Sequence, residues 1–190
     1  MRRVVGVPDG EDTLDFLAGL APDVRAEREA ALHVVEAEGM AQMRLMPGAR
    51  ELARFLDSRG VPRALVTRNK QEAVDIFHKT HFDLSPFCPA LTREFLPYKP
   101  HPAALQHIAQ HWGIEPEELV MIGDSAKDDV ASGRRAGAWT ILLDTEDRYE
   151  DEGAGLPAEH QPNFYATSLA DVQRILESEL LLTGPGDRRA

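Results

Sequence analysis

Three aspartates crowd one short loop: Asp124, Asp128 and Asp129 all lie in the string GDSAKDD. Two carboxylates a few ångströms apart repel each other by roughly 1 to 4 kcal/mol near a protein surface, so a positive group should lie between them. A hard divalent cation such as Mg²⁺ suits oxygen ligands and needs only one or two carboxylates. We therefore expect Asp124 and Asp128, which can face the same side of a first helical turn, to bind Mg²⁺. Asp129 is interpreted as a first-turn acid that stabilises a helix dipole.

Two further polar clusters have the residue types that hold a phosphoryl group. Thr67, Arg68 and Asn69 are consecutive, and Lys99 lies in a proline-rich loop. A threonine hydroxyl can donate to a phosphoryl oxygen, backbone amides at a helix start favour anions, and a lysine supplies a compact positive charge. These four are the candidate phosphate-binding residues. Alternatively, Thr67 is a helix N-cap, Lys99 a surface lysine and Arg68 an exposed rim residue.

The apolar pattern indicates how these clusters are positioned. Short apolar runs at 63–67, 119–122 and 139–143 predict buried strands, and helical patterns separate them. This alternation indicates an α/β fold with a parallel, doubly wound sheet, in which the carboxyl ends of the strands meet at one edge. Ligands bind at that edge, so we expect the three polar clusters to converge there.

Other segments give weaker signals. Residues 2–7 are interpreted as a short strand, 87–91 as a further strand, and 126–136 and 169–182 as helices. Acidic, Gly- and Pro-rich residues from 145 to 163 indicate a loop.

Composition excludes several classes of function. The 190 residues carry a formal net charge of -11, which disfavours binding to nucleic acid or an anionic membrane. The single cysteine allows no intrachain disulfide and fits a reducing compartment. No apolar run approaches the ~20 residues of a transmembrane helix. We expect a soluble intracellular protein, in the cytoplasm or in an organelle such as the chloroplast, whose oligomeric state stays open.

The order and spacing of these motifs resemble the haloacid dehalogenase-like (HAD) hydrolases, in particular plant and algal members with a small helical cap. VTRN is similar to the family's second motif, YKPHP to its third, and MIGDSAKDDVASGRRAGAWTILL to its fourth. The resemblance covers about residues 45–145. It implies a Rossmann-like parallel sheet and a Mg²⁺-dependent phosphatase of a small phosphate ester. In that reaction Thr67 and Lys99 would be catalytic, with Thr67 binding a phosphoryl oxygen and Lys99 orienting the nucleophile and the phosphate. Asp124 would ligate Mg²⁺, and Asp128 would support the metal shell.

The sequence departs from the family at its first motif, an apolar strand followed by Asp-x-Asp-Gly-Thr that carries the nucleophile. The nearest string, Val7-Pro8-Asp9-Gly10-Glu11, has valine where the nucleophilic aspartate belongs. We therefore expect a truncated N-terminus. On this interpretation 1–46 is a remnant helical cap, 47–183 the Rossmann-like core without the usual central first strand, and 184–190 a disordered tail.

Two functions remain open at this stage. The first is a phosphatase whose full-length form is active but whose present chain, lacking the nucleophile, is inactive. The second is a non-catalytic protein that keeps the phosphate and metal pocket for binding or regulation. A dehalogenase is less consistent with the acid cluster, because that chemistry uses no Mg²⁺. A metal site at His107 and His111, four residues apart on one helix, lacks a third ligand.

Loss of a central strand predicts poor folding of the chain. Four or five buried apolar side chains at ~1.5–3 kcal/mol each amount to roughly 6–15 kcal/mol. That equals the whole stability of a typical domain, about 5–15 kcal/mol. We expect far-UV circular dichroism of the 190-residue chain to show a broad, weakly cooperative thermal transition. A sharp cooperative melt would contradict this expectation.

Overall fold

The computed structural model describes residues 2–8 and 11–180, which form two compact units, 1–44 and 45–190. Each unit is described by itself. The tail predicted at 184–190 lies outside the described residues. No helix in the described ranges is long and apolar enough to cross a membrane.

The N-terminal unit is helical. It contains α1 (Arg2–Val5), α2 (Thr13–Ala18) and α3 (Pro22–Ala41). Val5, Val7, Leu17 and Leu32 are buried together and form its small core. The prediction of a strand at 2–7 is therefore wrong. A helical turn satisfies its own backbone groups, whereas an isolated strand in this unit would have no neighbour to pair with.

The C-terminal unit alternates strands with helices. Its strands are β1 (Leu65–Val66), β2 (Ala90–Leu91), β3 (Val120–Gly123), β4 (Trp139–Leu143) and β5 (Phe164–Ala166). Its main helices are α4 (Ala49–Ser58), α5 (Gln71–Thr80), α6 (Ala103–Trp112), α7 (Ala131–Ala136) and α8 (Leu169–Ser178). Short helical turns are η1 (Pro116–Glu118), η2 (Ala126–Val130), η3 (Glu150–Gly153) and η4 (Ala158–His160).

The strands form two parallel sheets. In the first, β1 pairs with β2, with Leu65 opposite Ala90. In the second, β4 lies between β3 and β5, with Ile122 opposite Ile141. Among the described residues no strand joins β1 to β3, so the parallel sheet is in two pieces. This α/β architecture with parallel sheets confirms the predicted fold class.

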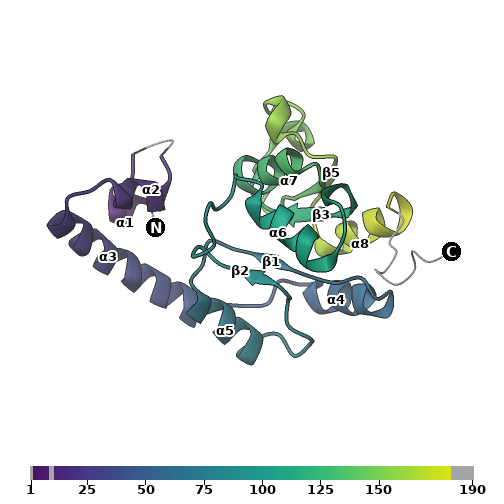
Figure 1. The fold of residues 1–190 in the computed structure, drawn as a ribbon, viewed down its shortest axis with the longest axis horizontal. Coiled ribbons are helices and arrows are strands. Elements are labelled where there is room, and N and C mark those ends of the chain that lie inside the picture. Colours follow the sequence, from purple (N-terminus) through teal and green to yellow (C-terminus); the bar gives the residue numbers. More distant parts are fainter. Residues whose placement is uncertain (1, 9–10, 181–190) are drawn as a thin grey trace. The chain divides into compact units, whose positions relative to one another are not determined.

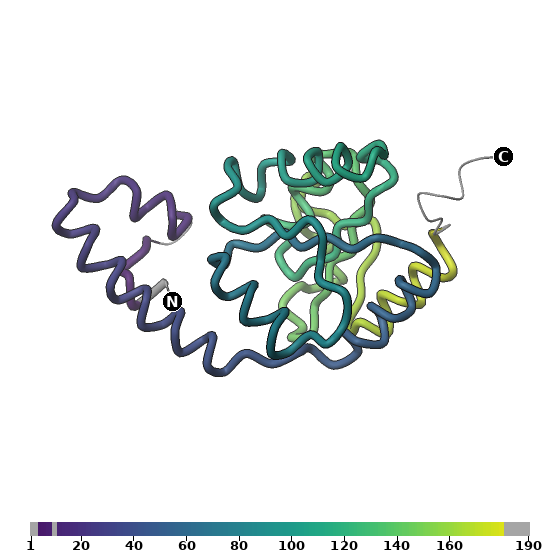
Figure 2. Tube along the Cα trace, turned by 60° about the horizontal axis from the view of Figure 1, so that its bottom comes forward, coloured from purple at the N-terminus to yellow at the C-terminus, as the bar shows by residue number. Residues whose placement is uncertain are grey.

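Helices cover both faces of the three-stranded sheet (Figure 1). Val120 and Ile122 pack into a cluster with residues of α4 and α8, whereas Met121 packs with residues of α6. Successive side chains of a strand point to opposite faces, so β3 is covered on both sides. Figures 1 and 2 both show α4 beside α8, and the core of this layer includes Ile141 and Val172, each fully buried.

Two predicted elements differ in detail, and one strand was not predicted. The helix expected at 126–136 begins with the wider turn η2 and becomes α-helical only in α7. The strand expected at 87–91 is reduced to β2. The strand β5 follows directly after the acidic segment that was predicted as loop, and it was missed because it is only three residues long.

Asp171 fastens the start of α8 through its side chain. Its Oδ2 accepts hydrogen bonds from Thr167 Oγ1 (2.8 Å) and Ser168 Oγ (2.8 Å), and its Oδ1 is paired with Arg174. These bonds, that from Thr167 above all, lower the pKa of Asp171 to about 2. The charged carboxylate therefore stabilises the folded state more than the unfolded state.

We predict that Asp171→Asn lowers the free energy of unfolding by about 1–2 kcal/mol at neutral pH. Because the folded pKa lies below the unfolded value of about 3.9, this loss should be full above pH 4 and shrink as the pH falls towards 2. Denaturant unfolding across that pH range measures it. Glu177→Gln, an exposed charge change on the same helix, serves as the control. A pH-independent difference between Asp171→Asn and the unsubstituted chain would contradict the prediction.

Candidate functional site

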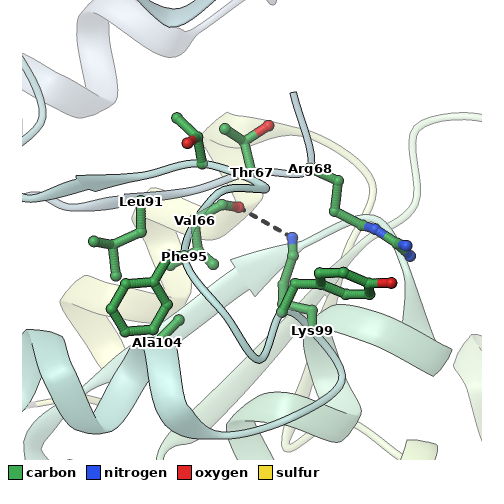
Figure 3. Close-up of a pocket in the computed structure, with 9 residues that line it drawn as sticks. Val66, Thr67, Arg68, Leu91, Phe95, Lys99 and Ala104 are labelled. Carbon is green, nitrogen blue, oxygen red and sulfur yellow. Dashed lines mark hydrogen bonds between the residues drawn. The ribbon is translucent and has the colours of Figure 1, made fainter. Parts of the chain in front are cut away.

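Lys99 joins two segments that are far apart in sequence. Its Nζ donates to the backbone oxygen of Val66 at the end of β1 (3.0 Å) and to Asp129 Oδ1 in η2 (2.5 Å). The two side chains are nearly buried, at 11% and 6% exposure, so the ion pair is shielded from water. Figure 3 shows the Lys99 ammonium directed at the Val66 carbonyl. Lys99 is therefore not a surface lysine.

Asp129 has a different environment from the one expected. Its Oδ1 accepts from Lys99, and its Oδ2 accepts from the backbone N of Ser125 (3.1 Å). A Cβ at Gly123 would lie 2.2 Å from Asp129 Oδ2, so only glycine leaves room for this carboxylate. The interpretation of Asp129 as a simple helix-dipole acid missed its pairing with Lys99, because two adjacent aspartates look alike in sequence.

Thr67, Arg68 and Lys99 line one small pocket at the end of β1, together with Tyr98 and Phe95. In Figure 3 the Thr67 hydroxyl and the Lys99 ammonium extend from opposite sides of the strand end.

Thr67 also organises the turn after β1. Its Oγ1 accepts from the backbone N of Asn69 (3.1 Å), a contact within the turn. The N-cap position of α5 is Lys70, so Thr67 is not the helix N-cap of the alternative interpretation. Asn69 itself is exposed and lies outside the set of pocket-lining residues, and its backbone oxygen accepts from the N of Arg93 (3.2 Å).

Arg68 lies between an aromatic ring and an acid. Its guanidinium is 4.7 Å from the centre of the Tyr98 ring, and its Nη1 is 3.8 Å from Asp128 Oδ2. The second contact brings the cluster after β1 next to the GDSAKDD loop.

The two predicted metal ligands lie on the open side of that loop. The Asp124 side chain is 68% exposed and that of Asp128 is 29% exposed. Asp128 is steadied by Ser125, whose Oγ donates to its Oδ2 (3.3 Å) and accepts from its backbone N (3.1 Å). In the described part of the chain no group of three or more His, Cys, Asp or Glu residues is placed to hold a metal. Asp124 and Asp128 offer two partly exposed carboxylates, the kind of oxygen donor that Mg²⁺ prefers, and Mg²⁺ needs only one or two of them.

Each aspartate of the loop has a positively charged partner from a different segment. Asp129 pairs with Lys99, Asp128 approaches Arg68, and Asp124 pairs with Arg148, whose Nη2 lies 3.1 Å from its Oδ2. The positive charge needed to offset repulsion among the three aspartates is thus supplied by the protein's own side chains. Sequence reasoning missed Arg148, because nothing in the acidic segment around it indicates a contact with residue 124.

Comparison with known proteins gives the family. A family profile described as haloacid dehalogenase-like hydrolase matches residues 2–137. A haloacid dehalogenase-like hydrolase domain-containing protein of Arabidopsis thaliana is 44% identical over 90% of this chain and 69% of its own length. An uncharacterized hydrolase of Saccharomyces cerevisiae is 40% identical over 93% of this chain and 80% of its own. A phosphoglycolate phosphatase of Haemophilus influenzae is 34% identical over 53% of this chain and 45% of its own.

Solved structures agree in fold. A hydrolase from Pseudomonas syringae has a TM-score of 0.70 and 20% identity, covering 86% of this chain and 73% of its own. A HAD family hydrolase from Deinococcus radiodurans, with bound phosphate and sodium, has a TM-score of 0.66 and 24% identity, covering 92% and 80%. This chain belongs to the haloacid dehalogenase-like hydrolase family.

Proposed function

We propose that the pocket at the end of β1 binds the phosphoryl group of a small phosphate ester beside Mg²⁺, as the substrate site of a HAD-type phosphatase. One observation carries the proposal: Lys99 bonds to both Val66 O and Asp129, and so brings the polar end of β1 against the acidic loop. A phosphoryl group bound there would meet the Thr67 hydroxyl and the backbone amides at one side of the strand end, and the Lys99 ammonium with the adjoining acidic loop at the other. The phosphoglycolate phosphatases among the relatives support a small phosphorylated substrate.

The chain's own residues divide the work of binding. Thr67 would donate its hydroxyl to a phosphoryl oxygen, and the backbone amides after β1, with Arg68 and Asn69, would favour an anion. Lys99 pairs with the buried carboxylate of Asp129, and its positive charge would also attract the phosphate. Asp124 and Asp128 would hold Mg²⁺, which supplies charge neutralisation for the phosphoryl oxygens.

Turnover needs a nucleophile that these residues do not supply. Phosphoryl transfer through an aspartyl-phosphate requires a carboxylate held at the site, and no part of the 190-residue sequence matches Asp-x-Asp-Gly-Thr. We infer that the chain as given binds phosphate without hydrolysing its esters, and that a form carrying the motif is the enzyme. The second candidate, a non-catalytic binding or regulatory protein, is favoured by the same lack of a nucleophile.

Binding of inorganic phosphate in the presence of Mg²⁺ tests the pocket directly. We expect saturable binding by calorimetry, and a roughly 10- to 150-fold weaker affinity for Thr67→Val, because a hydrogen bond to a charged group contributes about 1.5–3 kcal/mol. Thr80→Val, an exposed threonine on α5, is the matched control and should bind as the unsubstituted chain does. Equal binding by Thr67→Val and Thr80→Val would remove Thr67 from the site.

Hydrolysis of an aryl phosphate separates the two candidate functions. The chain as given should not exceed the buffer rate. A chain extended at its N-terminus by an apolar strand ending in Asp-x-Asp-Gly-Thr should gain Mg²⁺-dependent hydrolysis, and the same extension with Asn for its first Asp should not. If the extended chain folds and binds phosphate but stays inactive, the binding or regulatory function is the better assignment.

A further inference from the structure

The segment after β4 folds back onto the loop that carries Asp124. Arg148 Nη2 donates to the backbone oxygen of Asp124 (2.7 Å) and to its Oδ2 (3.1 Å). The hydroxyl of the next residue, Tyr149, donates to the same backbone oxygen (3.2 Å) and accepts from the backbone N of Ala126 (3.1 Å). Two consecutive side chains therefore hold two neighbouring peptide units of the acidic loop.

A buried carboxylate holds the segment that carries Arg148 and Tyr149 in place. Asp144 follows directly after β4 and is almost completely buried, at 1% exposure. Its Oδ2 accepts from the backbone N of Tyr149 (2.9 Å) and from the hydroxyl of Tyr165 (3.0 Å). Burial acts to raise the pKa of Asp144, but the hydrogen bonds from the Arg148 and Tyr149 backbone and from Tyr165 hold it below its ordinary value.

The second oxygen of Asp144 faces Arg148. Asp144 Oδ1 has no hydrogen-bond partner among the described residues and lies 3.7 Å from Arg148 Nε. An unpartnered buried oxygen is costly, so the nearby guanidinium is its compensation. The guanidinium therefore lies between two acids. Its Nε faces the buried Asp144, and its Nη2 faces the exposed Asp124.

This geometry matters because Asp124 is otherwise free to move. A side chain that is 68% exposed loses rotamer entropy when it binds a cation, and a prior hydrogen bond to one of its oxygens removes part of that cost. Arg148 holds Oδ2 and the backbone oxygen of Asp124 through Nη2 while its Nε faces Asp144, and the single ammonium of a lysine cannot present two separate nitrogens to the two acids.

We propose that Arg148 is the positioning residue for divalent-cation binding at Asp124, set in place by the buried carboxylate of Asp144. The inference rests on the proposed function, since it deepens the assignment of Asp124 as a metal ligand. In this role Arg148 would orient Asp124 by holding Oδ2, so that Oδ1 would be the oxygen available to a cation.

A pure counter-ion would have the opposite effect. If Arg148 only neutralised Asp124, its positive charge would repel an incoming cation, and removing it would strengthen cation binding. Partners that hydrogen-bond a metal-ligating carboxylate typically change metal affinity by about 10–100-fold when they are removed. The sign of the change therefore decides between the two roles.

Binding of Mn²⁺, followed by the loss of the free-ion electron paramagnetic resonance signal, tests the proposal without any turnover. We expect Arg148→Gln to weaken Mn²⁺ binding about tenfold and Arg148→Lys to recover only part of it. Arg50→Gln is the matched control for loss of one positive charge, because the Arg50 side chain is 42% exposed, that of Arg148 is 41% exposed, and Arg50 pairs with Asp83 away from this loop. It should bind Mn²⁺ as the unsubstituted chain does.

Two further variants separate the possible failures. Tyr149→Phe removes the second contact to the loop but keeps the guanidinium, and it should change Mn²⁺ affinity less than Arg148→Gln. Asp124→Asn tests the cation site itself. If Asp124→Asn weakens binding while Arg148→Gln binds equally or more tightly, the positioning role is overturned and the metal site stands. If the unsubstituted chain binds no Mn²⁺, or binds it as Asp124→Asn does, the proposed metal site and the positioning role fail together. Thermal melts of each variant show whether a change in affinity follows from unfolding.

Discussion

The ion pair between Lys99 and Asp129 connects the two parts of the sheet. No strand among the described residues bridges β1 and β3, so the backbone ladder is interrupted between them. Lys99 spans part of that interruption with its side chain, by bonding a carbonyl at the end of β1 and a carboxylate in the turn after β3. A buried ion pair of this kind contributes little net stability as a whole. Removal of one partner, however, leaves the other charge buried without a counter-ion and destabilises the folded state by about 3–5 kcal/mol. The pair therefore fixes where the acidic loop lies with respect to β1.

Charge balance explains how so many ionised groups share a small volume. Three acids from one loop meet three bases that come from positions 68, 99 and 148, so the loop is already neutralised before any ligand arrives. A phosphate dianion and a divalent cation also sum to zero. Their joint entry would leave the balance unchanged, whereas either one alone would disturb it. This favours a site in which cation and phosphate bind together.

Sequence patterns predicted the parts of this fold that depend on local composition. The apolar runs of β3 and β4 were visible because both strands are covered on two faces, and the glycine at 137 marked the end of α7. Residues 2–5 could not be assigned correctly, because two valines near a chain start fit a strand and a helical turn equally well. The choice between Asp128 and Asp129 as the partner of Lys99 depends on the wide turn η2, which shifts the direction of each side chain. The contact of Arg148 with Asp124 spans 24 residues and leaves no local signal.

Gly123 shows how a residue without a side chain can govern a charge. The place where its methyl group would go is filled by the carboxylate of Asp129. Even the smallest addition, Gly123→Ala, would clash with this carboxylate and displace it. The ammonium of Lys99 would then lose the ion-pair partner that holds it at the end of β1. The tolerance of the pocket to change is thus set partly by empty space, at a position that itself offers no chemistry to a ligand.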